Sequence, residues 1–472
     1  MDRNLQIVPG MAKTWTISPD GIVYTFKLRD AKWSDGQPVK AADFVFAWQR
    51  ATDPATAAEY AYQMAYLKNA NEITAGTAAP DTLGVKAIDD KTLEVTLASP
   101  CAYFINLTGF PTYFPLREDV VSKDPTGWST SAATFVSNGP YKLQDWTHDA
   151  SITMVKNDNY WNASTVLPKE LKFVLMSNAN TILASFKTGE IQYADIVPPE
   201  EIPALKADGS LNIAPMLGIR YFNFNNEKAP FTDVRVRQAI TLAIDRNYIA
   251  ETVLQDGSLP AGAMVPPSIP DAAAGSDFRT IGKDYYSTAA ADYDANVAKA
   301  KQLLADAGFP DGKGFPTIAY LTNDAGPNVP IAEAVQQQLK DKLGITMNIE
   351  VQEWSVFQQN RIDGNYEVCR GGWVGDYVHP MTFLDMFLSG SSLNDPHFKS
   401  TDYDNLIMNA KKETNLTKQF DMMHQAESLL IGQNYACAPI TYYTEPQIIS
   451  SKLKGMIHSP LGFKYFMWST IE

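Results

Sequence analysis

The first third of the chain alternates between short apolar runs and turn residues. Val23–Leu28 alternates apolar and polar side chains, which is the period of a half-buried β-strand. Asp89 and Asp90 are turn residues between two further runs of this kind, and together they predict a hairpin. By the same reasoning we expect strands over 83–88, 92–97, 141–146 and 151–155, and a short helix over 41–49.

The pattern changes to helical spacing in the middle of the chain. Apolar residues recur every three to four positions over 233–253, and this is the clearest helix signal. Asp294 as N-cap and Gly308 as terminator bound a second helix over 294–307. Further helices are expected over 181–188 and 331–343, and strands over 213–224, 345–351 and 366–373. This alternation predicts an α/β architecture with a mixed sheet.

Length and charge narrow the class of protein. A chain of 472 residues is too long for one ordinary core, so two or three domains are expected. Hydrophobic residues make up 45% and charged residues 19%, as in folded proteins. The 39 Lys and Arg against 53 Asp and Glu give a net charge of −14. Such a field repels phosphate, which disfavours nucleic acid and anionic membranes as partners.

The number of cysteines and the lack of long apolar runs indicate in which cellular compartments the protein could work. Cys101, Cys369 and Cys437 allow at most one disulfide, and no two have metal-ligand spacing. Three buried thiols are the favoured interpretation; if a bridge forms, we expect Cys369–Cys437, because both lie in strand-like runs. No apolar run is long enough to span a bilayer, and the chain starts without a signal peptide. These features fit the cytoplasm or a processed periplasmic protein.

Motifs for catalysis are missing from the sequence. It has no GxGxxG, Walker, HExxH or GxSxG motif, and its five histidines stand singly. We therefore predict no catalytic residue, no metal and no cofactor, with a peptidase using paired carboxylates as a remote alternative. The 11% of aromatic residues suits ligand clefts as well as cores.

The stretch 352–377 is unusual because it concentrates charged and aromatic residues. In a strand, Arg370 and Asp376 point to the same face, since their spacing is even. A cation and an anion held apart on one surface match a zwitterion such as a peptide. The alternative is a solvated strand-and-turn surface with a salt bridge.

Long ordered matches give the chain a family resemblance. They cover 31–39 (AKWSDGQPV), 42–50 (ADFVFAWQR), 83–90, 137–141, 230–239 and 373–377. Along nearly its whole length the chain resembles the solute-binding proteins of oligopeptide ABC transporters, the OppA type of the dipeptide/oligopeptide-binding family. The resemblance implies an α/β fold: a two-lobed clamshell of the class II periplasmic-binding-protein type, with an extra domain in the first lobe.

The same resemblance implies the domain limits and the partners. Residues 1–136 are expected to form the added domain, 137–217 with 449–472 the rest of the first lobe, and 218–448 the second lobe. The implied protein is periplasmic and monomeric, is no enzyme, and needs no cofactor. It captures short peptides and delivers them to ABC permease subunits at the inner membrane. A signal sequence, and any lipid anchor, would lie upstream of this chain.

The resemblance also implies roles for individual residues. Asp376 is expected to pair with the peptide's free amino group, and Arg361 and Arg370 with its terminal carboxylate. Backbone groups at Gly372 and Val374 are expected to pair with the peptide as with an added strand. The aromatic pocket residues implied are Trp354, Trp373, Tyr60, Tyr221 and Tyr465.

Three departures from the family pattern affect the expected ligand. Gly218 and Val374 occupy the positions of the usual disulfide, and Leu254 and Asn328 stand where relatives carry a Lys and a His that bind the peptide's carboxylate. The chain also begins where those relatives already have an N-terminal stretch, so it is expected to be a fragment or a naturally short form. The preferred peptide length is then altered, or the solute is specialised: a murein tripeptide, a signalling peptide or a peptide-like metal chelate. Holding unfolded chains is an open secondary activity.

Overall fold

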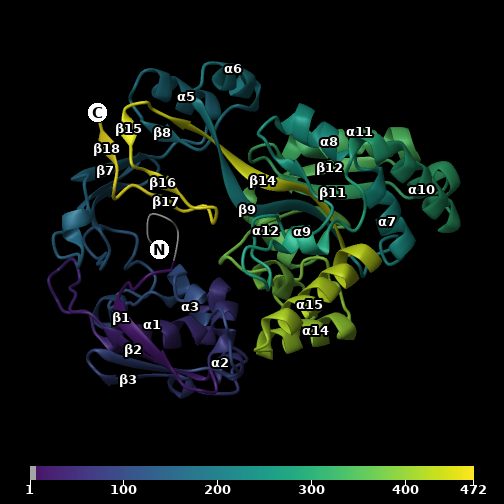
Figure 1. Ribbon diagram of the computed structural model, residues 1–472. Helices are drawn as coiled ribbons and strands as arrows, with labels where there is room; N and C mark the ends of the chain where they lie inside the picture. Colours follow the sequence, from purple (N-terminus) through teal and green to yellow (C-terminus); the bar gives the residue numbers. More distant parts are fainter. Residues whose placement is uncertain (1–6) are drawn as a thin grey trace. The chain divides into compact units, whose positions relative to one another are not determined.

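The structure, a computed structural model, describes residues 7–472, and the chain divides into two units (Figure 1). Unit 1 ends at Ala194 and is completed by Ile449–Ser459 and Phe463–Glu472, whereas unit 2 comprises Asp195–Ile448 with Pro460–Gly462. The chain thus passes from unit 1 to unit 2 after Ala194, before the boundary that was expected at 217/218. The reason is that β9 (Leu211–Phe224) is one continuous strand, which pairs with β14 (Cys437–Ile449) on both sides of that boundary.

Unit 1 is built around an antiparallel sheet of order β1-β2-β4-β3. The predicted alternation in β2 is confirmed, because Tyr24, Phe26 and Leu28 are 4%, 6% and 4% exposed. A second antiparallel sheet, β5-β6-β7, follows. The strands of unit 1 are β1 (Ala12–Ile17), β2 (Val23–Leu28), β3 (Val85–Asp89), β4 (Thr92–Thr96), β5 (Tyr141–Thr147), β6 (Ser151–Lys156), β7 (Glu170–Val174), β8 (Tyr193–Ala194), β15 (Leu453–Lys454), β16 (Ile457–His458), β17 (Lys464–Tyr465) and β18 (Thr470–Ile471).

Helix α1 (Ala41–Thr52) covers the first sheet with its apolar face, which includes the buried side chains of Phe44 and Trp48. The indole N–H of Trp48 donates to the carbonyl of Tyr113 over 2.9 Å, so this buried polar group is satisfied. The other α-helices of unit 1 are α2 (Ala70–Thr74), α3 (Phe104–Leu107), α4 (Glu118–Val121) and α5 (Ala179–Lys187).

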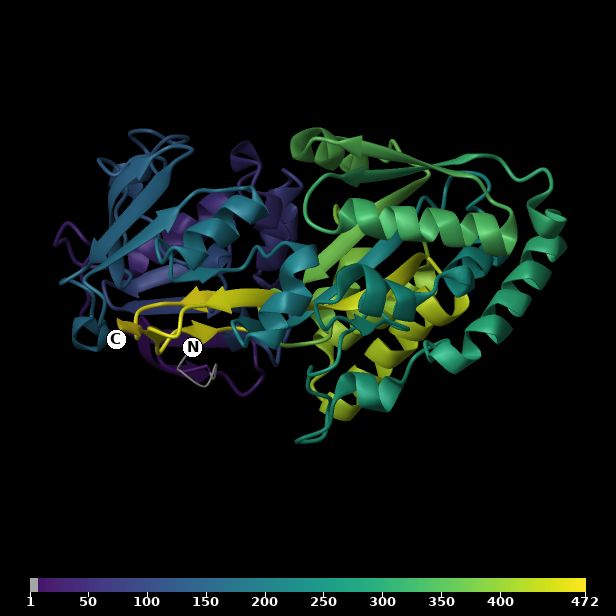
Figure 2. The same cartoon turned by 90° about the horizontal axis from the view of Figure 1, so that it is seen from above.

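Unit 2 contains the predicted mixed sheet, whose strands follow the order β10-β14-β9-β13-β11-β12. Here β11 (Ile318–Asn323) runs parallel to β12 (Met347–Gln352) and β13 (Val368–Val374), whereas β9 is antiparallel to β13 and β14. Helix α11 (Asn328–Leu343) packs on β11 and β12, as Figure 2 shows. The remaining elements are β10 (Leu259–Pro260), α6 (Ile202–Ala207), α7 (Val234–Ala243), α8 (Arg246–Tyr248), α9 (Phe278–Gly282), α10 (Tyr293–Asp306), α12 (Trp354–Ile362), α13 (Met381–Leu384), α14 (Thr401–Lys412) and α15 (Leu416–Glu427).

The single helix predicted over 233–253 is wrong, because the backbone is extended at Ile244 between α7 and α8. Asp245 caps the second segment by accepting the Tyr248 N–H over 3.0 Å. The buried guanidinium of Arg246 donates to the carbonyls of Thr241 and Ile244, at 3.0 Å each. Periodicity does not reveal this break, because side-chain hydrogen bonds replace those that the helix loses. A smaller difference concerns α10, which begins at 293, so Asp294 lies in its first turn and is not the N-cap.

The three cysteines are buried free thiols. Cys369 and Cys437 both pair with Asn223, from opposite sides of β9. Two strands that flank a third are about 10 Å apart, beyond the span of a disulfide. The bridge considered between them therefore does not form.

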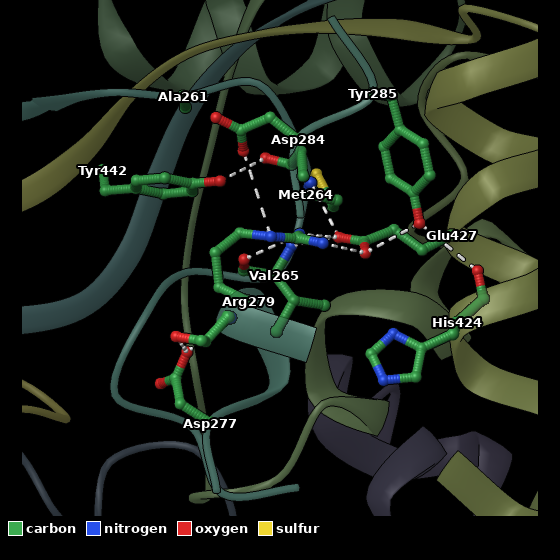
Figure 3. Close-up of polar contacts among 12 residues, drawn as sticks. Ala261, Met264, Val265, Asp277, Arg279, Asp284, Tyr285, His424, Glu427 and Tyr442 are labelled. Atoms are coloured by element: carbon green, nitrogen blue, oxygen red, sulfur yellow. Dashed lines mark hydrogen bonds and ion pairs between the residues drawn. The ribbon is translucent and has the colours of Figure 1, made fainter. Parts of the chain in front are cut away.

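A buried ion pair ties together distant parts of unit 2 (Figure 3). Glu427, at the end of α15, is 0% exposed and accepts from Arg279 Nη1 and Nη2 at 2.8 and 3.0 Å. The same carboxylate accepts the backbone N–H groups of Met264 and Val265, at 2.9 and 2.7 Å, and the hydroxyl of Tyr285 at 3.2 Å. Burying a charge is costly unless it is fully paired, and here the partners come from loop, helix and strand-flanking segments.

We predict that Glu427→Gln lowers the free energy of unfolding by about 3–5 kcal/mol, because the buried Arg279 then keeps only the partly exposed Asp284 carboxylate, 3.9 Å from its Nε, as a counter-charge. The measurement is urea unfolding followed by circular dichroism. Glu94→Gln is the control: it breaks an exposed pair, Lys86–Glu94 at 2.8 Å, and is expected to cost only about 0–1 kcal/mol. Equal losses in the two variants would contradict this assignment.

Candidate functional site

Strand β13 has one fully paired edge and one that is largely open. On one side all its residues, from Val368 to Val374, pair with β9. On the other side β11 pairs only with Val368 and Cys369. From Arg370 onward this second edge carries no strand partner among residues 7–472. An open edge of this kind is a template for an added strand.

Hydrogen-bonded and non-bonded pairs alternate between β13 and β9, and this alternation decides which backbone groups of β13 point toward the open edge. The N–H of Gly375 donates to the carbonyl of Leu217 over 2.8 Å, which continues the register of β13 on β9. Bonded and non-bonded pairs alternate along an antiparallel ladder. The N–H and C=O groups of Arg370, Gly372 and Val374 therefore point toward the open edge. Two of these, Gly372 and Val374, are the residues predicted to offer their backbone.

Tyr443, which the sequence analysis did not single out, lies on the sheet beside this edge. Its ring is 4.3 Å from the guanidinium carbon of Arg220, and a Cβ at either Gly218 or Gly372 would collide with it. Gly218 and Val374, the positions of the missing disulfide, are direct partners in the register. The ring covers the backbone at Gly218, which explains why glycine is needed there, whereas a Cβ at Gly372 would meet the Tyr443 hydroxyl.

We predict that Gly218→Ala destabilises unit 2 by about 1–3 kcal/mol, because the new methyl group overlaps the Tyr443 ring and lies 3.0 Å from the carbonyl oxygen of Trp373. Denaturant unfolding measures this loss. Gly390→Ala, where nothing lies within 4 Å of the added Cβ, is the control and should change stability by less than about 0.5 kcal/mol. In a double-mutant cycle Tyr443→Ala should relieve most of the cost; additive effects would contradict the steric explanation.

Asp376 lies just beyond β13, so the alternation argument that put it on one face with Arg370 does not apply to it. It is 9% exposed, and its N–H donates to the hydroxyl oxygen of Thr382 over 3.1 Å. The indole N–H of Trp373 donates to the same oxygen over 3.4 Å. Thr382 thus orients two predicted site residues, and nothing in the sequence pattern pointed to it. Burial lowers the pKa of neighbouring His379 to about 3, so the imidazole carries no charge at neutral pH.

Arg370 differs from the other arginines of unit 2 because its guanidinium group lies against aromatic rings and not against a carboxylate. Its guanidinium carbon is 5.8 Å from the Trp354 ring and 5.9 Å from the Phe357 ring, both on α12. Within residues 7–472 no carboxylate lies at ion-pair distance from it. The other arginines of this unit bond to carboxylates or backbone carbonyls: Arg220, Arg235, Arg237, Arg246, Arg279 and Arg361. Aromatic faces stabilise a cation but do not neutralise it, so Arg370 remains able to bind an anion.

Arg361, by contrast, already has a carboxylate partner. Its Nη1 is 2.8 Å from Oδ2 of Asp395, and the two side chains are 19% and 6% exposed. The hydroxyl of Tyr366 donates to the main-chain carbonyl of Asp395, which fixes that residue. Burial raises the pKa of Asp395 to about 6, although Arg361 acts in the opposite direction. The two predicted cations therefore differ in their availability to a ligand.

The raised pKa of Asp395 predicts a pH dependence of stability. A carboxyl group whose pKa is higher in the folded state contributes stability that is complete below its unfolded pKa of about 4. That contribution is lost as the pH rises through about 6. From pH 4 to pH 7, the wild type should lose about 1–3 kcal/mol of unfolding free energy relative to Asp395→Asn. Urea unfolding at each pH gives this difference, and a constant difference would contradict the assignment.

The structure places the remaining predicted residues in different settings. Tyr221 is 1% exposed, with its ring over Gly371, so it belongs to the core and not to an open pocket wall. Leu254 is also core, at 2% exposed, whereas Asn328 begins α11 and donates to the Asn323 side chain over 3.0 Å. Tyr60 and Tyr465 belong to unit 1, and burial raises the pKa of Tyr465.

The described residues were also compared with the requirements of metal and thiolate sites. In 7–472 no three His, Cys, Asp or Glu side chains gather as a metal site. Burial raises the pKa of the Cys369 and Cys437 thiols, which disfavours a reactive thiolate. Over the same range, no helix has the length and apolarity to cross a membrane. What the site offers is an open strand edge, an anion and an uncompensated cation.

Comparison with known proteins identifies the family of the chain. The profile described as bacterial extracellular solute-binding proteins, family 5 Middle, matches residues 6–395. The oligopeptide-binding protein OppA of Bacillus subtilis is 36% identical over 468 residues, which are 97% of this chain and 83% of that protein. The Haemophilus influenzae OppA complex with RPPGFSPFR has a TM-score of 0.87 at 31% identity and covers 98% of this chain and 90% of its own. The Escherichia coli murein tripeptide binding protein MppA has a TM-score of 0.90 at 32% identity, and the match covers 100% of this chain and 91% of that one.

The predicted family and the α/β clamshell fold class are thus confirmed: the chain belongs to family 5 of the bacterial extracellular solute-binding proteins.

Proposed function

We propose that this protein captures short peptides outside the cytoplasm and delivers them to the permease of an ABC transporter. The observation that carries the proposal is the open edge of β13, flanked by Arg370 at its start and Asp376 just past its end. The names of the relatives, oligopeptide-binding proteins among them, support the same solute class.

The open edge accounts for affinity without sequence preference. A peptide main chain that adds to β13 hydrogen-bonds to the exposed backbone groups of Gly372 and Val374, whatever its side chains are. Gly372 has no side chain of its own, and the Tyr443 hydroxyl lies where its Cβ would be.

The charges give the peptide a direction. Arg370 attracts the terminal carboxylate and Asp376 the amino group, so the added peptide runs antiparallel to β13. The six residue steps between them span about 20 Å when extended, which together with the reach of the two side chains suits a short peptide.

Aromatic residues are proposed to shape the side-chain pockets. Trp354 is 48% exposed and supports Arg370 on one side, while Trp373 is held by Thr382. Both are proposed to form walls beside the added strand. Asn328 is proposed to hydrogen-bond to the solute, and Tyr60 and Tyr465 stay predicted pocket residues of unit 1.

Peptide capture implies a binding protein and not an enzyme. We propose that it works in the periplasm as a monomer, with permease subunits and peptides as its partners. The rival proposal is a specialised solute in the same fold, such as a murein tripeptide, which is favoured by the TM-score of 0.90 to the E. coli murein tripeptide binding protein. Native mass spectrometry of the purified protein separates the two: a ladder of peptide masses supports general capture, and one sharp mass supports the rival.

We predict that N-acetylation of Ala-Ala-Ala weakens binding about 10- to 100-fold, because it removes the charge that pairs with Asp376. Asp376→Asn should weaken binding of the free peptide similarly and should leave the acetylated peptide almost unaffected. In the same way, Arg370→Met should affect the free acid but not the C-terminal amide. Isothermal titration calorimetry measures each pair.

Asp385→Asn is the matched control for these variants, because Asp385 forms an ion pair with Lys411 at 2.9 Å and lies outside β13 and the turn after it. Equal binding of free and blocked peptides by the wild type would contradict the roles of both charges.

A further inference from the structure

Two arginines meet the same face of α12. Trp354, Phe357 and Arg361 are spaced by three and four residues, so they lie along one side of the helix. Arg370 reaches this side from β13 and lies over the first two of these residues. Arg361 follows Phe357 by about one helical turn, or ~6 Å. If both cations were open to the solute, they would favour a ligand residue with two carboxylates, such as a C-terminal glutamate.

Asp395 makes Arg361 less available to a ligand carboxylate than Arg370 is. Its carboxylate is 2.8 Å from Arg361 and only 6% exposed, so water screens the pair poorly. The Nε of Arg361 is buried and has no hydrogen-bond partner among the described residues, which leaves Asp395 as its main polar contact. The main chain of Asp395 is held by the Tyr366 hydroxyl, so this carboxylate is not free to swing away.

A ligand carboxylate next to this pair gains little. Arg361 and Asp395 together are neutral, and a second carboxylate is repelled by the first at short range. Arg370 has no such neighbour, and its charge is stabilised only by aromatic rings.

We infer that Asp395 is an internal counter-ion that withholds Arg361 from the solute and leaves Arg370 as the one cation of unit 2 that receives a carboxylate. The inference rests on the proposed peptide-binding function and narrows its substrate class. The preferred ligands carry a single carboxylate at their C-terminal end, and a second carboxylate adds no affinity. Asp395 is therefore a residue that determines specificity, acting through Arg361.

The test compares Ala-Ala-Glu with Ala-Ala-Gln, which differ by one charge and have nearly the same shape. Calorimetry at pH 7.5 should show that the wild type binds the two within about threefold. Asp395→Asn frees Arg361 and should prefer the glutamate peptide by about tenfold or more, as expected for a new charge-assisted hydrogen bond. Asp385→Asn, which breaks an ion pair of similar length, should retain the wild-type ratio.

A double variant, Arg361→Gln with Asp395→Asn, removes both charges and keeps the inference testable if the single variant does not fold. It should bind Ala-Ala-Gln within about threefold of the wild type, with no preference for glutamate. A tenfold loss would show that Arg361 holds the ligand, and this would overturn the inference. A wild type that prefers glutamate, or a folded Asp395→Asn without that preference, would overturn it as well.

Failure of the proposed function has a different signature. A wild type that binds neither tripeptide, nor any peptide from its host, overturns peptide capture and the inference with it. A wild type that binds both peptides, with Asp395→Asn showing the same ratio, overturns only the role of Asp395.

Discussion

The pairing of β13 with β9 is the constraint on which the candidate site depends. All the residues of β13 are bound on that side, so the strand stays in register while its other edge is left open beyond Cys369. Because the ladder alternates, the same register that fixes Gly375 to Leu217 turns Gly372 and Val374 outward. A shift by one residue would reverse this arrangement, and the backbone groups offered to a peptide would face β9 instead.

Charge compensation then separates the arginines of unit 2 that have a partner in the protein from the one that has aromatic neighbours only. Arg279 is surrounded by Glu427 and its partners, and Arg246 satisfies the carbonyls freed at a helix break. Arg361 has Asp395, and Arg370 has aromatic faces alone. A charge that the protein leaves without an opposite charge is a candidate site for a ligand of the opposite charge. By this measure Arg361 and Arg370 differ in their availability to a ligand.

Much of the fold was accessible from local patterns. Alternation in 23–28 and the turn at Asp89 and Asp90 predicted strands that the structure contains. The Gly308 terminator closed a helix as expected, with a positive φ of 98°. Local patterns failed where a distant or side-chain contact overrides them. The break at Ile244 depends on Arg246, whose guanidinium bonds to the carbonyls of Thr241 and Ile244.

The sequence by itself determined the family and the α/β class, and it pointed to the stretch 352–377 as the candidate site, because ordered motifs and hydrophobic periods are properties of the chain alone. Only the tertiary structure decided which of those residues are available to a ligand. Tyr221 is buried in the core, Asp376 lies beyond the end of β13, and Arg361 pairs with a carboxylate 34 positions along the chain. Availability depends on burial and on through-space charge pairs, and neither can be deduced from residue spacing.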